Sequence, residues 1–179
     1  MKQLSFYFSL LLLGSTLFSC TEEDLAKFLG HIDGNEKQHF VTTLNGANEI
    51  PEAVHTRATG QLTLEVSEDG EKIKFALTVA DLDNYLAGHI HVGEDSVNGP
   101  VVAWVFPIEP YPFTDFIDDP LVPGTSNGVL SKGVLTADNL VGPLEGMSLD
   151  ALVSELKAGN AYVNLHTSQF PAGEIRGNF

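Results

Sequence analysis

The sequence has a single cysteine, few basic residues and none of the common nucleotide-binding or serine-hydrolase motifs. Of its 179 residues, 9 are Lys or Arg and 24 are Asp or Glu, so the formal net charge is −15. A surface this acidic repels phosphate backbones, which argues against nucleic acid as a partner. The chain contains no P-loop, no Gly-x-Gly-x-x-Gly and no Gly-x-Ser-x-Gly pattern, so nucleotide-dependent and serine-hydrolase chemistry have no support.

The one cysteine, Cys20, follows an apolar N-terminal segment. Residues 4–13 form an almost unbroken apolar run after Lys2, and residues 14–20 read GSTLFSC. This run is too short to span a bilayer and has the order of a secretory signal. The end of the segment resembles the lipidation motif of bacterial lipoproteins, although Phe18 is bulkier than that motif prefers. The alternative is an ordinary signal peptide with a leftover thiol, since one cysteine cannot form an internal disulfide.

We therefore predict three parts: a lipoprotein signal peptide at 1–19, an acidic tether at 20–38 and one globular domain at 39–179. The acidic residues at 22–24 resemble the surface-export signals of Bacteroidota lipoproteins, with a generic solvated linker as the alternative. Loss of the signal removes Lys2 and makes the mature chain one unit more negative. The predicted location is the cell envelope, with the lipid on Cys20 in the outer membrane and the domain facing the periplasm or the cell surface.

Short strands separated by turns dominate the domain. Residues 62–66 and 73–79 alternate apolar and polar side chains around the turn EDGE at 68–71, which predicts a hairpin. Ser148 and Gly159 bracket a helical repeat at 148–157. The pattern predicts an all-β fold, an antiparallel Greek-key β-sandwich with one short helix. Further strands are expected at 40–44, 89–92, 101–106, 128–136, 161–167 and 174–179, with a proline-rich loop or lid at 107–125.

Two histidines one residue apart, in GHIHVG at 88–93, are the main candidate for a functional site. On a strand, His89 and His91 project from the same face, about 6 to 7 Å apart. A third histidine, His166, lies in a similar strand-like setting in AYVNLHT at 161–167. Three imidazoles suit Cu or Zn and leave a coordination position open. The alternative is three hydrogen-bonded structural histidines, and His55 is a candidate fourth ligand.

Four sequence blocks resemble the chordin-type (CHRD) domain over nearly all of 39–179. The most specific block is GNAYVNLHT at 159–167 followed by PAGEIRG at 171–177. This resemblance implies an extracytoplasmic immunoglobulin-like β-sandwich. It does not imply the growth-factor antagonism of animal chordin, because the cysteine-rich modules associated with that function are missing here. The other blocks are LNGANEIP at 44–51 with ATG at 58–60, and GHIHVG at 88–93 with NGPVV at 98–102.

The segment 88–93 also resembles the copper-binding strand of copper/zinc superoxide dismutases. The zinc-loop pattern of those enzymes and their disulfide are absent from this chain. The resemblance therefore implies a related sandwich and a simplified metal site, and it does not imply the enzyme.

Three further residues near the C-terminus are expected to support the histidines or the fold. Asn164 shares a strand face with His166 and is placed to orient that imidazole. Glu174 and Arg176 lie two apart, and we interpret them as a structural pair that bonds to backbone or to each other, with Glu174 as a general base the alternative.

Together these patterns favour a non-enzymatic binding module with a candidate Cu or Zn site and an unknown extracellular protein or glycan as partner. Two alternatives stay open: a metal-dependent redox enzyme distantly like superoxide dismutase, and a purely structural or adhesive surface protein.

The anchor makes the first testable prediction. A Cys20→Ser variant should move from the membrane fraction to the soluble fraction. Each buried methylene of an acyl chain contributes about 0.8 kcal/mol to anchoring, and the serine cannot carry the thioether-linked lipid. Fractionation followed by immunoblotting measures the shift. Retention of the variant in membranes would show that lipidation of Cys20 is not the anchor.

Overall fold

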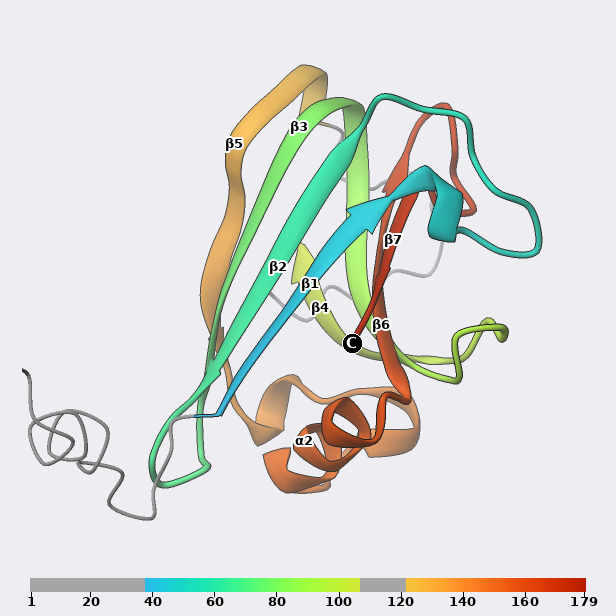
Figure 1. Ribbon diagram of the computed structural model, residues 1–179. Coiled ribbons are helices and arrows are strands. Elements are labelled where there is room, and N and C mark those ends of the chain that lie inside the picture. The colour runs from blue at the N-terminus through green and yellow to red at the C-terminus, as the bar shows by residue number, and fades with distance from the viewer. Residues whose placement is uncertain (1–37, 107–121) are drawn as a thin grey trace, which may run out of the picture. The chain divides into compact units, whose positions relative to one another are not determined.

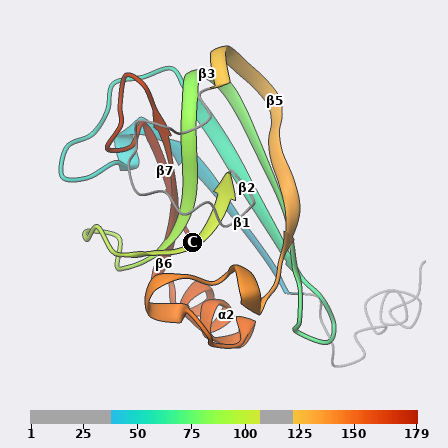
Figure 2. The same ribbon diagram turned by 180° about the vertical axis from the view of Figure 1, so that it is seen from behind.

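The structure, a computed structural model, describes residues 38–106 and 122–179 (Figures 1 and 2). The predicted signal peptide, nearly all of the tether and most of the predicted loop at 107–125 lie outside the described residues. In the described part no helix is long and apolar enough to cross a membrane. The strands are β1 (His39–Asn45), β2 (Thr59–Val66), β3 (Ile73–Val92), β4 (Val101–Phe106), β5 (Val122–Leu135), β6 (Ala161–Thr167) and β7 (Ile175–Asn178). The helices are α2 (Leu149–Ala158) and three short 3-10 turns, η1 (Gly46–Asn48), η2 (Ala137–Asn139) and η3 (Gly142–Leu144).

The 20-residue strand β3 is the longest of the elements in the described residues, and its two halves pair with different strands. Its first half pairs with β2 and β5, and its second half pairs with β4 and β6. The sequence predicted two separate strands here, at 73–79 and 89–92, and that division was wrong. Asp81 and Asn84 adopt φ values of 54° and 50°, a left-handed conformation that Asp and Asn tolerate, so the strand bends without ending.

The bend of β3 lets the sheet close on itself. The strands follow the order β2-β1-β7-β6-β3, and β2 pairs in turn with the first half of β3, all in antiparallel register. The predicted all-β antiparallel fold with one short helix is confirmed, in a closed, barrel-like form of the sheet (Figure 1). One boundary differs, because residues 122–125 belong to β5 and not to the loop expected at 107–125.

Alternating side chains fill the interior of the barrel. Leu62 and Leu64 of β2 and Ile73 and Leu77 of β3 are fully buried, as the predicted hairpin requires. The helix α2 adds four apolar residues to the same core and ends at Gly159, whose φ of 73° favours glycine. The helical residues in the core are Leu149, Leu152, Val153 and Leu156.

Strand β6 is buried on both of its faces. Val163 and Leu165 belong to the hydrophobic core. Tyr162, Asn164 and His166 alternate with them and therefore point away from the core, yet each is at most 8% exposed. A second, polar buried layer therefore lies on the outer face of the barrel, and this layer holds the candidate site.

Close packing beside this layer gives a prediction for stability. A Cβ added at Gly88 would lie 2.5 Å from the hydroxyl oxygen of Tyr85 and 2.6 Å from Cδ2 of Leu165. We expect Gly88→Ala to lower the free energy of unfolding by about 1–3 kcal/mol, the usual cost of overpacking. Urea unfolding measures the change.

A double-mutant cycle isolates the cause. The buried Tyr85 hydroxyl has no hydrogen-bond partner, so Tyr85→Phe should not destabilise the protein by itself. In the Tyr85→Phe background, Gly88→Ala should cost less, because one of the two close contacts is gone. An equal cost in both backgrounds would contradict this account of the packing.

Candidate metal centre

Three histidines meet on the outer face of the β3–β6 pair. His89 and His91 lie two apart on β3, and His166 pairs with Ala87 on the neighbouring strand. The ligand nitrogens of the three rings lie within 4.8 Å of one another. The rings are 3%, 9% and 8% exposed, in that order. The structure thus brings His166 to the His89–His91 pair.

Backbone carbonyls fix the protonation of two of these rings. Nδ1 of His91 lies 2.9 Å from the carbonyl oxygen of Gly99, and Nδ1 of His166 lies 2.9 Å from that of Pro171. A carbonyl only accepts hydrogen bonds, so each Nδ1 carries the proton and each neutral ring presents a lone pair at Nε2. Nε2 of His91 has no hydrogen-bond partner, and neither nitrogen of His89 has one.

The side-chain amide of Asn164 faces Nε2 of His166. This nitrogen lies 3.1 Å from Oδ1 of Asn164. Two acceptors that face each other repel, so either the Asn164 amide is turned to donate from Nδ2 or a cation is shared between them. Asn164 therefore lies beside the predicted ligand, where the sequence analysis placed it.

Burial keeps the cluster neutral. It lowers the pKa of His89 from 6.5 to about 2 and that of His91 to about 4, and it also lowers the pKa of His166. The charges that neighbouring histidines would carry add to the effect at His89 and His91. Only a neutral imidazole can ligate a metal, so the rings are held in the form that binds one.

Aromatic rings and a guanidinium hold the histidines in place. Tyr162 stacks on His91 with a centroid distance of 4.6 Å and an interplanar angle of 9°. The guanidinium carbon of Arg176 lies 3.5 Å from the centre of the same tyrosine ring. Trp104 meets His89 edge to face at 4.0 Å. These contacts restrict the orientations of the His89 and His91 rings.

Arg176 also organises the loop between β3 and β4. Its side chain is fully buried, and Nη1 donates to Oδ1 of Asn98 at 3.1 Å. Nη2 donates to the backbone carbonyls of Glu94, Asp95 and Val97 at 3.3–3.4 Å. The captured loop continues into Gly99, the residue whose carbonyl faces His91.

Glu174 takes different partners from Arg176. Its two carboxylate oxygens accept from the hydroxyls of Thr56 and Thr167, each at 2.6 Å. These bonds join the loop before β2 to the end of β6. The structure therefore places Glu174 and Arg176 in two separate hydrogen-bond networks. His55 is exposed and is not part of the histidine group.

Two residues of this layer were missed by the sequence reasoning. Glu49 is 6% exposed, its Oε1 has no hydrogen-bond partner, and burial raises its pKa to about 7 against the opposing effect of Arg176. A Cβ at Gly173 would lie within 3 Å of both Glu49 Oε1 and Asn164 Nδ2, so the carboxyl borders the layer. Trp104 is the other, and its position opposite His89 on β4 becomes visible only from the strand register.

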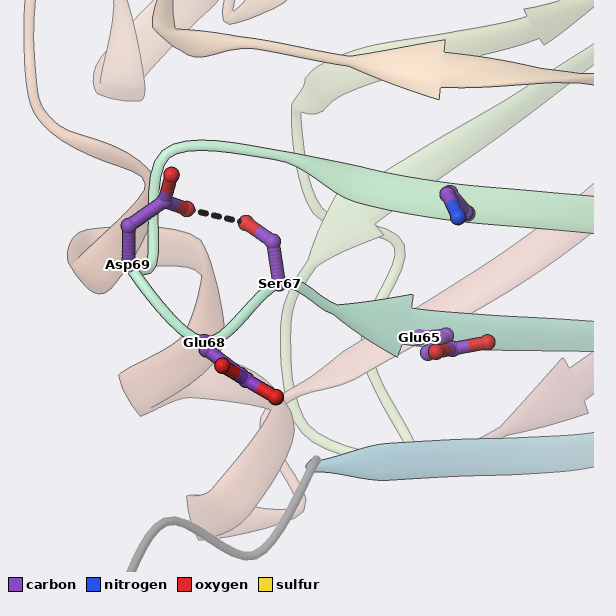
Figure 3. A pocket seen from close by; sticks show the side chains of 5 residues that line it. Glu65, Ser67, Glu68 and Asp69 are labelled. Atoms are coloured by element: carbon purple, nitrogen blue, oxygen red, sulfur yellow. Dashed lines mark hydrogen bonds between the residues drawn. The ribbon is translucent and has the colours of Figure 1, made fainter.

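A surface hollow at the β2–β3 turn is a different feature (Figure 3). It is lined by Glu65, Ser67, Glu68, Asp69 and Lys74. Ser67 donates to the Asp69 carboxylate at 2.5 Å, and this bond lowers the pKa of that exposed group. This hydrogen bond closes the turn and involves no buried polar group, so the hollow does not have the features of a ligand-binding site.

A closed antiparallel β-barrel with a buried histidine cluster on its outer face defines the class of protein. Comparison with known families then identifies it: the chain matches the CHRD domain over residues 40–179 and belongs to that family. No curated protein and no solved structure matches the chain. The resemblance to superoxide dismutases therefore rests on residues 88–93 alone.

The neutral histidines predict how stability depends on pH in metal-free protein. As the pH falls below 6.5, each of these histidines becomes protonated in the unfolded chain but stays neutral in the native protein. The free energy of unfolding therefore falls by about 1.4 kcal/mol per pH unit for each histidine. The window runs from 6.5 down to about 4 for His91 and to about 2 for His89. Glu49 acts in the opposite direction between pH 4.5 and about 7, because its native carboxyl holds a proton that the unfolded chain releases.

A single substitution separates these contributions. In the His89→Gln variant, the slope of the free energy of unfolding against pH should be smaller than in the parent by the contribution of one proton. His55→Ala, at an exposed position, should leave the slope unchanged. Urea unfolding at a series of pH values measures both. A parent and a His89→Gln variant with the same slope would show that His89 is not held neutral by burial.

Proposed function

We propose that this CHRD-domain protein is a lipid-anchored binding module of the cell envelope that holds a transition metal, Cu or Zn, at His89, His91 and His166. The observation that carries the proposal is the set of three buried imidazoles whose ligand nitrogens lie within 4.8 Å of one another. Imidazole is a ligand for both metals. The sequence around Cys20 supports the anchor, and family membership supports an extracytoplasmic place for the domain.

The free ring nitrogens explain why a metal fits better than a purely structural role. Buried polar atoms are nearly always hydrogen-bonded, and each that is not costs about 1–3 kcal/mol. Here three nitrogens on two rings, both of His89 and one of His91, are buried without partners. A metal ion would satisfy one nitrogen on each ring, whereas a structural network would have used them already.

A binding role is preferred to an enzymatic one. Among the described residues, the group of potential ligands contains the three histidines and no fourth. The buried carboxylate of Glu174 is bonded to two hydroxyls, and Cys20, the only thiol, is assigned to the lipid. Turnover assays with superoxide and peroxide on metal-loaded protein would distinguish the redox-enzyme alternative, which predicts catalysis that depends on His89 and His91.

Metal analysis tests the proposal directly. Protein purified without a histidine tag should contain or take up about one Cu or Zn per chain, and a His89→Ala/His91→Ala variant should not. At a free metal concentration 100-fold above Kd, binding should raise the stability of the parent by about 2.7 kcal/mol and raise its Tm. His55→Ala is the matched control and should bind like the parent. If added Cu or Zn changes neither metal content nor Tm of the parent, the metal site is wrong.

A further inference from the structure

We propose that the cluster of His89, His91 and His166 selects the cuprous ion, Cu(I), over Zn(II) and Cu(II). This inference rests on the proposed metal site and names the ion that it prefers. The observation behind it is that the ligand set has no negative charge: among the described residues, no carboxylate or thiolate joins the three imidazoles.

Charge is the first reason. The cluster is buried, with its rings between 3% and 9% exposed. The cost of moving an ion out of water rises with the square of its charge, so a divalent ion costs about four times as much as a monovalent one of the same size. Carboxylate or thiolate ligands normally offset that cost, and neutral imidazoles do not. The site therefore penalises the second positive charge.

A fixed positive charge next to the cluster acts in the same direction. Arg176 lies 3.5 Å from the centre of the Tyr162 ring, and Tyr162 stacks on His91. Arg176 and His91 therefore contact the same tyrosine ring, which brings the fixed positive charge of the guanidinium close to that imidazole. Its hydrogen bonds go to neutral oxygens of the 94–98 loop and to Asn178, so these partners do not cancel its charge. Glu49 is the buried carboxyl that opposes this effect, and burial raises its pKa, which weakens the negative charge it offers.

Coordination number is the second, independent reason. Zn(II) in proteins takes four ligands, so a site with three imidazoles needs a bound water as the fourth, and Cu(II) prefers a tetragonal arrangement with at least four donors. The strand register supplies three imidazoles, two from β3 and one from β6. Oδ1 of Asn164 lies 3.1 Å from His166 Nε2, and an amide oxygen is a neutral donor. Cu(I) is satisfied by a trigonal set and has no need of a fourth ligand.

The test compares three ions in one protein. The Cys20→Ser chain is used, because it lacks the only thiol that would compete for Cu(I). Cu(I) is titrated without oxygen in ascorbate against a chromogenic cuprous chelator at pH 6.5, and Zn(II) and Cu(II) are titrated against their own competing chelators at the same pH. We expect Cu(I) to bind at least about tenfold more tightly than either divalent ion. Each tenfold preference over Cu(II) raises the reduction potential of bound copper above that of the aqueous ion by about 59 mV, which voltammetry measures separately.

Variants assign the binding to the cluster. His89→Ala and His166→Ala, on different strands, should each lose high-affinity Cu(I), whereas His55→Ala should keep it. Trp104, the only tryptophan, touches His89, so paramagnetic Cu(II) forced into the site should quench its fluorescence and Zn(II) should not.

The outcomes separate the two proposals. If Zn(II) or Cu(II) binds more tightly than Cu(I), and the same variants lose that binding, the preference for Cu(I) is overturned and the proposed metal site is supported. Absence of binding for all three ions would overturn both. Cu(I) affinity that survives His89→Ala and His166→Ala would place the copper elsewhere and would also overturn the inference.

Discussion

The antiparallel register between β3 and β6 is the constraint on which the rest of the structure depends. It pairs His89 with Asn164 and Ala87 with His166, so the three histidines and Asn164 fall on one face, opposite the core residues Ile90, Val163 and Leu165. A slip of one residue would turn His89 and His91 into the hydrophobic core and expose Ile90. The same strand β3 closes the barrel through its pairing with β2, which ties closure of the fold to formation of the cluster.

The second requirement is a cover for that polar face. Loops around residues 94–99 and 168–173 bury side chains that would otherwise face water, and Arg176 secures the first of them through backbone carbonyls. The cost of burying a guanidinium is offset by these bonds and by stacking on Tyr162. The result is a buried site on the outside of a barrel, in which the histidines stay neutral.

Much of this could be predicted from the sequence, because period-two alternation is a local signal. It located the β2–β3 hairpin, the spacing of His89 and His91, and a third histidine on a strand. The continuity of β3 could not be predicted, since Asp81 and Asn84 are typical of a loop and only tertiary pairing keeps the strand intact. Glu49 carries no periodic signal, and three of the oxygens that accept from Arg176 are backbone carbonyls, which every residue has. The candidate ligands could therefore be predicted from the sequence, whereas the buried charged groups around them could not.

The central claim is that the fold holds three neutral histidines with their ligand nitrogens within 4.8 Å of one another. Long-range proton–nitrogen NMR correlation of the imidazoles in metal-free protein at pH 6.5 measures this directly. The account predicts neutral rings for all three residues, with the proton on Nδ1 in His91 and His166. An imidazolium at any of the three, or a proton on Nε2 of His91, would contradict it.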